Sequence, residues 1–439
     1  MQFNVKWIAA IAVVIVAAGI GIYALSVKQT SPEAGIAAGR LQPGAVMPPG
    51  HPPVSRGDLP SGMPGSPQPD MGSFSPVHPP VGQASLPDAL RSGKAHLDPN
   101  SKFTHFRVGN SNVKSIYVDG KVTWVGTSGG LIRYDTGTDE FRLFDNRNGL
   151  LSNGVFYVGK FDDRIFAGTY GGGLSLYDQT RDTWKNINVP NGLGDPFVYG
   201  VVKTANGDIW IATWSGANRI RGGKLDDRSM WDVYTVENTK GGLPNNWVYG
   251  VAEGKNGDIW FATEGGPARF NDGKWTNWNH AKGVGADFEI VKKDPQFGND
   301  PARLSSHHAQ QAKEMGLEGV GVAYNPNYII SMVVDRKGVV WCGTWGAGLA
   351  RFDGKKWRNY TMADGLPGNH IFTLHEDQFG QLWIGTNNGL ARFEGNKVKV
   401  LTTADGLFSN IIFSMATGPD GSKWLGSFGG VTHLAPSKK

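Results

Sequence analysis

The sequence predicts an all-β fold: a seven-bladed β-propeller with an N-terminal transmembrane helix and a Pro-rich linker. Three observations predict it: a strand-and-turn pattern that recurs seven times, an abundance of Gly and Trp, and an apolar N-terminal run followed by a proline-rich segment. Gly and Pro supply 63 and 25 of the 439 residues, whereas charged residues supply only 18%, which disfavours helical bundles and coiled coils. We therefore expect many short strands joined by tight turns.

The composition also excludes several kinds of site and partner. Cys342 is the single cysteine, so an intramolecular disulfide cannot form, and no CxxC, CxxCH or Cys/His cluster is present for zinc, haem or an iron–sulfur centre. The 43 basic and 38 acidic residues give a net charge of +5 and are scattered, unlike the basic stripe typical of nucleic-acid binding. We expect no cofactor, no metal ion and no nucleic-acid partner.

Residues 1–28 are predicted to form a transmembrane signal anchor. Residues 7–27 are 21 consecutive uncharged positions, close to the roughly 20 that cross a bilayer as a helix. A cleaved signal peptide is the alternative, but its apolar region is shorter and no clean A-x-A site follows. A short cytoplasmic N-terminus then predicts a single-pass protein of the bacterial inner membrane, with the propeller in the periplasm.

Residues 29–100 are predicted to be a disordered Pro/Gly-rich linker. Fifteen of the 25 prolines lie between positions 31 and 100, and aromatic residues are almost absent. The string HPPV-x4-LP occurs twice, beginning at His51 and His78, with Met47, Met63 and Met71 nearby. His and Met side chains can bind copper, but a repeated spacer explains the same pattern without metal.

Residues 101–439 are predicted to form the propeller. One pattern recurs: an aromatic residue, a small or apolar residue, Gly or Ala, Thr or Ser, and a glycine-containing turn. The spacings between successive aromatics are 42, 44, 50, 81, 42 and 41 residues, and the period of about 40–45 is typical of four-stranded propeller blades. The seven aromatics are Trp124, Phe166, Trp210, Trp260, Trp341, Trp383 and Trp424.

The last repeat ends after its third strand, whereas residues 102–108 form an unpaired strand before the first repeat. We expect this N-terminal strand to complete the last blade and close the ring. The 81-residue spacing predicts an insertion at about 281–323 with a short helix, because Asp300 can cap it, Pro301 suits its first turn and Gly316 stops it. An eighth, degenerate blade is the alternative. The insertion would decorate the loop face, which carries the turns between second and third strands and the connections between blades.

The units NGDIWIAT, NGDIWFAT and DQFGQLWIGTNNGLARF, followed by DGLPGN or DGLFSN, resemble the two-component regulator propeller repeat over residues 103–434. In that family such units build extracytoplasmic sensor domains of hybrid histidine kinases. The resemblance implies a seven-bladed sensor propeller, here without the histidine kinase part. The string IWFATE is also similar to streptogramin lyases, seven-bladed enzymes that use a divalent metal and a His general base. A metal-dependent lyase or hydrolase of that type is the alternative function.

The candidate binding residues lie on the loop face. The residue after Gly-Thr, Ala-Thr or Gly-Ser is aromatic in four of seven units, where a turn favours small polar residues, so we expect exposed rings that contact a protein partner or a carbohydrate or peptide ligand. Packing against neighbouring turns is the alternative. Trp247 in an adjoining connection would enlarge the patch. His307 and His308 of the inserted helix could form a site with His280 or His370, and a solvated helix face is the alternative. The predicted ligand- or partner-binding residues are Tyr170, Trp214, Trp247, Trp345, Phe428 and His370.

Other repeated residues have structural interpretations. The second-strand aromatics should pack between blades, the third-strand arginines should lie against them, and Cys342 should fill a buried apolar position. First strands should line the channel with a column of mostly small or hydroxylic residues: Ser115, Tyr157, Gly200, Gly250, Ser331, Thr373 and Ser414. Paired carboxylates, a Ser/His/Asp set and a metal cluster are missing from this pattern. The prediction is a binding, sensing or scaffolding module rather than an enzyme.

Overall fold

The computed structural model describes residues 91–292, 323–394 and 397–436, together with a few positions between 309 and 319. The chain divides into two units, Met1–His51 and Pro52–Lys439, and the fold described below belongs to the second. In the described part, no helix is long and apolar enough to cross a membrane. The predicted anchor at residues 1–28 and most of the predicted linker lie outside the described residues.

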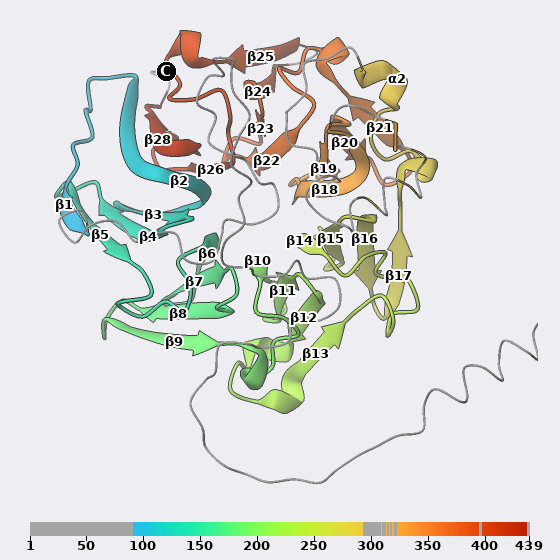
Figure 1. Cartoon of the computed structure of the whole chain (residues 1–439), viewed down its shortest axis with the longest axis horizontal. Helices are drawn as coiled ribbons and strands as arrows, with labels where there is room; N and C mark the ends of the chain where they lie inside the picture. Colours follow the sequence, from blue (N-terminus) through green and yellow to red (C-terminus); the bar gives the residue numbers. More distant parts are fainter. Residues whose placement is uncertain are drawn as a thin grey trace, which may run out of the picture. The chain divides into compact units, whose positions relative to one another are not determined.

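Antiparallel blades of four strands lie around a central channel (Figure 1). Blade 1 contains the second half of β2 (Phe103–Asp119) with β3 (Val122–Thr127), β4 (Gly130–Asp135), β5 (Glu140–Phe144) and a short outer strand, β1 (Ser92–Lys94). Blade 2 contains β6 (Val155–Phe161), β7 (Arg164–Thr169), β8 (Leu174–Asp178) and β9 (Thr183–Ile187). Blade 3 contains β10 (Val198–Lys203), β11 (Ile209–Thr213), β12 (Gly216–Ile220) and β13 (Trp231–Tyr234).

The remaining blades repeat this order. Blade 4 contains β14 (Val248–Glu253), β15 (Ile259–Thr263), β16 (Gly266–Asn271) and β17 (Lys274–Asn277), and blade 5 contains β18 (Asn325–Val334), β19 (Val340–Trp345), β20 (Leu349–Phe352) and β21 (Trp357–Tyr360). Blade 6 contains β22 (Ile371–Glu376), β23 (Leu382–Thr386), β24 (Gly389–Glu394) and β25 (Lys397–Leu401). Blade 7 contains β26 (Ser414–Thr417), β27 (Lys423–Gly426), β28 (Phe428–Leu434) and the first half of β2.

Strand β2 is shared between the first and last blades. Its first half pairs with β28, where Phe103 lies opposite Leu434 and His105 opposite Thr432. Its second half pairs with β3 as the innermost strand of blade 1. The eight-stranded sheet therefore consists of two blades. Together with the five four-stranded sheets, it gives seven blades in the described residues. The predicted closure of the ring by residues 102–108 is confirmed.

A side-chain hydrogen bond explains the repeated Thr and Gly of the motif. In blade 3 the Thr213 hydroxyl donates to the carbonyl oxygen of Gly216 at 2.8 Å, which closes the turn between the second and third strands. Gly216 has a φ of 106°, and a Cβ there would lie 2.1 Å from the Tyr234 carbonyl oxygen, so the turn requires glycine. The same bond joins Thr127 to Gly130, Thr169 to Gly173, Thr263 to Gly266, Thr344 to Gly348, Thr386 to Gly389 and Ser427 to Gly430.

The second-strand aromatics pack between neighbouring blades, as predicted. Trp210 of blade 3, for example, belongs to a buried cluster with Leu243 and Phe261 of blade 4. In four blades the arginine of the third strand places its guanidinium over the second-strand tryptophan of the same blade. These pairs are Arg219 with Trp210, Arg269 with Trp260, Arg351 with Trp341 and Arg392 with Trp383. Cys342 is fully buried, also as predicted, and burial raises the pKa of its thiol.

Short helices occupy the connections. One-turn 3-10 helices lie at Val189–Asn191, Arg221–Gly223, Arg228–Met230, His280–Lys282, Met362–Asp364 and Thr403–Asp405. Helix α2 (Phe288–Val291), which the sequence did not predict, buries Val291 and packs Phe288 on Tyr324. Within the predicted inserted helix, Ala309 and Lys313 are helical, whereas most of that helix, with His307 and His308, lies outside the described residues.

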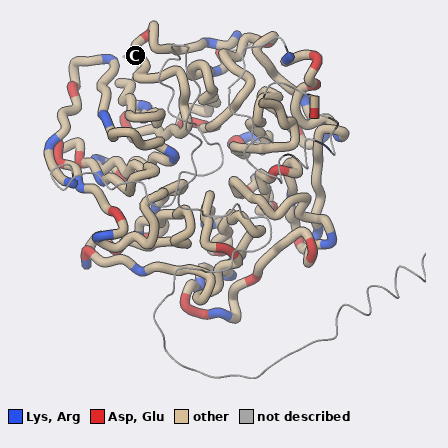
Figure 2. The backbone as a smooth tube through the Cα atoms, in the orientation of Figure 1, with Lys and Arg blue, Asp and Glu red and all other residues tan. Residues whose placement is uncertain are grey.

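Basic and acidic residues are both spread along the periphery of the described chain (Figure 2). Many of them form exposed pairs between neighbouring elements, such as Arg142 with Asp182 and Lys203 with Asp162. Such pairs each contribute about 0–1 kcal/mol, so the fold depends mainly on the apolar clusters between blades.

Candidate ligand-binding channel

A β-bulge interrupts the first strand of each of the first six blades at the same position. In blade 3, Val198 lies opposite Thr213 and Gly200 lies opposite Ala212, so the register shifts at Tyr199, which is the extra residue of the bulge. An extra residue of this kind bends the strand and redirects its own side chain. The residues at this position in blades 1 to 7 are Lys114, Phe156, Tyr199, Tyr249, Ile330, Phe372 and Phe413, where Phe413 immediately precedes β26.

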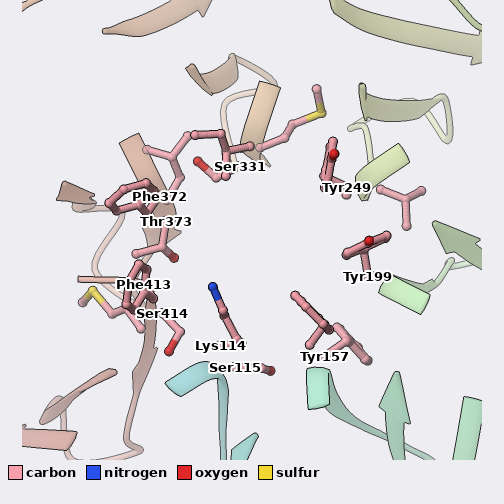
Figure 3. Close-up of a pocket in the computed structure, with 18 of the residues that line it drawn as sticks. Lys114, Ser115, Tyr157, Tyr199, Tyr249, Ser331, Phe372, Thr373, Phe413 and Ser414 are labelled. Carbon is pink, nitrogen blue, oxygen red and sulfur yellow. The ribbon is translucent and has the colours of Figure 1, made fainter. Parts of the chain in front are cut away.

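These seven side chains, which we call the channel ring, line a central cavity of about 420 Å³. Neighbouring members touch: the ring centroids of Phe156 and Tyr199 lie 5.1 Å apart, those of Tyr199 and Tyr249 also 5.1 Å, and those of Phe372 and Phe413 5.3 Å. Figure 3 shows labelled members of the ring around the open centre of the channel. The bulge lies at the end of the first strand that meets the turn between the second and third strands, so the ring lies toward the loop face.

Lys114 occupies the position in blade 1 that aromatic residues hold in most other blades. Its ammonium lies 4.6 Å from the ring centroid of Phe413 and 6.0 Å from that of Phe156, so it contacts the aromatic residues of both neighbouring blades. Burial among these apolar groups lowers the pKa of Lys114 to about 8. The amine therefore keeps its proton at neutral pH.

The predicted column of small first-strand residues also lines the cavity, but its hydroxyls join neighbouring blades. Ser115 accepts a hydrogen bond from the backbone N–H of Val158 at 2.7 Å. The Ser331 hydroxyl donates to the carbonyl oxygen of Ile371, and that of Ser414 donates to the carbonyl oxygen of Val113, both at 3.0 Å. These residues stabilise the channel wall. His375, two residues after Thr373 of this column, is hydrogen-bonded to Thr417 of the next blade at 2.8 Å.

The expected exposure of the turn aromatics is wrong. Tyr170, Trp214, Trp247 and Trp345 are buried, as is His370, and only Phe428 is half-buried. The turns fold inward because large apolar rings gain more from contact with each other than from contact with water. Their binding role stays a prediction. Trp345 lines the central cavity itself, whereas Tyr170 and Trp214 would act through the rings that they contact.

The structure brings the turn aromatics together with the channel ring. Tyr170 lies behind Phe156 at 5.9 Å, Trp214 behind Tyr199 at 6.3 Å and Trp345 behind Phe372 at 6.0 Å between ring centroids. Trp214 also contacts Trp247 at 4.2 Å, and Trp345 contacts His370 at 5.0 Å. At the equivalent turn of blade 4, the buried Glu264 accepts a hydrogen bond of 2.6 Å from the Tyr249 hydroxyl. The turns therefore form a second layer that holds the ring residues in place.

Sequence reasoning missed the channel ring because it assumed regular alternation in the first strands. Under that assumption Ser115 and its equivalents point into the channel and the residues before them point away. A signal was available: five of the seven positions immediately before the small column hold Phe or Tyr. Their regular recurrence could have identified a second column of channel residues.

The described residues contain no cluster of three or more His, Cys, Asp or Glu side chains arranged to hold a metal ion. His370 is fully buried, and burial lowers its pKa to about 3, so the imidazole is neutral near pH 7. The described lining of the cavity offers aromatic surface, hydroxyls and one ammonium. This arrangement can bind a ligand by stacking and by charge.

The fold and the channel define a closed seven-bladed repeat propeller with a central cavity lined by aromatic residues. Three stretches of the chain, residues 242–265, 323–346 and 365–388, match the two component regulator propeller family model. The chain therefore carries two component regulator propeller repeats, as the sequence predicted. A comparison with curated proteins finds no match.

Solved structures share the fold. The extracellular domain of the hybrid two component system BT3049 from B. thetaiotaomicron is 22% identical with a TM-score of 0.57, over 79% of this chain and 41% of that one. A catalytically inactive virginiamycin B lyase from Staphylococcus aureus, solved with quinupristin, is 13% identical with a TM-score of 0.52, over 76% and 99%. YCF48 bound to D1 peptide is 12% identical with a TM-score of 0.50, over 79% and 100%. This chain thus spans less than half of the first structure.

Proposed function

We propose that the chain is a membrane-anchored periplasmic propeller that captures a ligand or a protein segment at its channel ring and serves as a sensing or scaffolding module. The channel ring is the observation that carries the proposal. Bulges in successive blades redirect large side chains into one cavity, although a packed channel of small residues would satisfy the fold. Exposed aromatic surface around a cavity is typical of binding sites.

The anchor and the compartment rest on the sequence. The uncharged stretch at residues 7–27 is long enough to span a bilayer, and the proline-rich segment after it suits a spacer between membrane and propeller. The similarity to extracellular domains of two component systems supports the same orientation. Protease added to spheroplasts should then digest the propeller, whereas intact cells should protect it.

The binding proposal is tested with a double variant of the ring. Tyr199→Ala with Phe372→Ala removes two rings from the cavity, and both lie on the channel side of their blades, so the fold should persist. The purified full chain is titrated with a panel of oligosaccharides, peptides and small aromatic compounds, with intrinsic tryptophan fluorescence as the readout. A ligand bound by the unmodified chain should lose at least tenfold in affinity in the double variant, as expected from lost aromatic contacts.

The matched control is Phe379→Ala. Phe379 is 69% exposed in the hairpin between β22 and β23, away from the ring, so its loss should not change affinity. If the double variant kept full affinity for the ligand, the channel ring would not be the binding site.

A further inference from the structure

The channel has one charged side chain among the described residues that line it. That residue is Lys114, and the rest of the described lining consists of aromatic, aliphatic, small and hydroxylic residues. The Lys114 side chain points into the open centre of the channel (Figure 3). Lys114 is half-buried, and an ammonium that is partly removed from water is less favourable unless a negative group compensates it. The flanking rings of Phe156 and Phe413 supply only part of that compensation.

The rest of the cavity wall favours an aromatic group. Tyr199, Tyr249 and Phe372 present half-buried rings to the channel, and the hydroxyl of Tyr249 is held by Glu264. Glu264 itself is fully buried behind this ring, so its carboxylate does not line the cavity. Offset or edge-to-face contacts with such rings stabilise a planar ligand group.

A neutral sugar fits this lining less well. Sugars are recognised through many hydrogen bonds, but the hydroxyls of Ser115, Ser331 and Ser414 are engaged with backbone atoms of the adjacent blades. The cavity of about 420 Å³ lies within the range of roughly 300–1,000 Å³ for small-molecule sites. A ligand with one aromatic ring and one acidic group therefore complements the described surface of the cavity.

We infer that the channel ring binds a small aromatic carboxylate, whose carboxylate pairs with the Lys114 ammonium while its ring stacks against the aromatic wall. This inference rests on the proposed function and specifies its ligand class. The pair would be desolvated by Phe156 and Phe413, which strengthens a charge-assisted hydrogen bond.

The test uses phenylacetate as the probe. Phenylacetamide has the same shape without the charge, and 2-phenylethylammonium carries the opposite charge. Isothermal titration of the full chain at pH 7 should give at least tenfold tighter binding of phenylacetate than of either compound, because hydrogen bonds to charged groups are worth about one to two powers of ten. Equal affinity for phenylacetate and phenylacetamide would overturn the inference, and this comparison needs no variant.

Variants then test whether Lys114 is the residue that causes the preference for phenylacetate. Lys114→Met keeps most of the side-chain length and should lose at least tenfold in phenylacetate affinity while its phenylacetamide affinity stays constant. Lys114→Arg should retain the preference for the anion. Lys274→Met, at an exposed position in β17, removes one positive charge far from the channel and should bind like the unmodified chain. A preference for phenylacetate that survives Lys114→Met would also overturn the inference.

The two proposals fail separately. If phenylacetate does not bind but a ligand of another class binds and is lost in the Tyr199→Ala, Phe372→Ala variant, the carboxylate inference is wrong and the proposed function stands. If that double variant does not weaken phenylacetate binding, both are wrong, because the ring would not form the site.

Discussion

At the scale of single residues, an aspartate before the second strand organises the space between blades. In four blades its carboxylate accepts a hydrogen bond from the second-strand tryptophan or the third-strand arginine. These bonds join Asp208 to Arg219, Asp258 to Trp260, Asp335 to Trp341 and Asp377 to Trp383. In blade 6 the carboxylate of Asp377 also pairs with the Lys423 ammonium of blade 7 at 3.1 Å, which links two blades through a buried charge pair.

Asp377→Asn should therefore destabilise the propeller strongly. Only 4% of the Asp377 side chain and 6% of the Lys423 side chain are exposed, so the variant leaves a buried ammonium without its counter-charge. Breaking a buried pair in this way costs about 3–5 kcal/mol. Asp226→Asn, which removes the exposed partner of Lys185, should change the free energy of unfolding by less than about 1 kcal/mol. Guanidinium denaturation of both variants measures the difference, and similar losses would contradict a special role for Asp377.

The candidate site shows which residue features are visible in a sequence. The recurring turn aromatics were recognised, and they do lie near the channel, but their burial could not be read from a turn position. Whether Trp214 points outward or packs on Trp247 depends on a contact between neighbouring blades, and the two residues are 33 positions apart in the sequence. The bulge at Tyr199 was hidden for a similar reason, since it depends on the pairing of two strands rather than on the composition of one.

At the scale of elements, β2 is the least repetitive part of the propeller. Its first half contributes Phe103, Phe106 and Val108 to the apolar contacts around blade 7, and Phe106 packs on both Tyr134 and Trp424. It also supplies backbone partners to β28, which would otherwise be an unpaired edge. One strand thus provides both the hydrogen bonds and the apolar contacts of the seam.

Replacement of residues 102–108 by a Gly/Ser segment of equal length should lower the free energy of unfolding by about 4 kcal/mol or more, because the buried Val108, the half-buried Phe103 and Phe106 and one edge pairing are lost together. Replacement of β1 by Gly-Ser-Gly is the control. That strand is exposed along its length and forms the fifth strand of a complete blade, so its loss should have a much smaller effect. Chemical denaturation monitored by tryptophan fluorescence compares the two. Equal effects would mean that the seam is not what holds the ring closed.

At the scale of the whole molecule, burial of histidines couples stability to pH. Burial lowers the pKa of His370 to about 3 and that of His375 to about 4, and it lowers the pKa of His433 as well. Above about pH 6.5 these histidines are neutral in both folded and unfolded chains and have no effect on stability. As the pH falls below 6.5, the unfolded chain binds protons that the folded chain does not, so the folded state loses stability.

Each such histidine should contribute about 1.4 kcal/mol per pH unit to this loss between its unfolded and folded pKa values. His370→Asn should therefore flatten the dependence of the unfolding free energy on pH between 6 and 4 by about that amount. His105→Asn, at an exposed position, is the matched control and should follow the unmodified chain. Denaturation at a series of pH values gives both slopes. An unchanged slope in His370→Asn would show that His370 does not control the acid sensitivity.

The architecture could be predicted from sequence to a greater depth than the site. Seven copies of one short motif fixed the number of blades, and the unpaired strand before the first copy identified the closure at β28. Helix α2 lies in the non-repeated stretch between β17 and β18, where a single sequence offers no second copy for comparison. A repeated motif allows the architecture to be predicted from one sequence. The proposed ligand preference depends instead on a residue that departs from the repeat, Lys114, at a position where most blades have an aromatic residue.

The sharing of β2 between two blades also constrains the order of folding. Phe103 cannot pair with Leu434 until nearly the whole chain has been synthesised, and contacts between residues so distant in sequence form slowly. The six blades between them can form their meanders from local contacts, each as soon as its own strands are available. The last blade then remains three-stranded, with β28 as an open edge, until the N-terminal strand joins it. Ring closure is thus the natural final step, and the incomplete ring is the species most prone to pair with another chain.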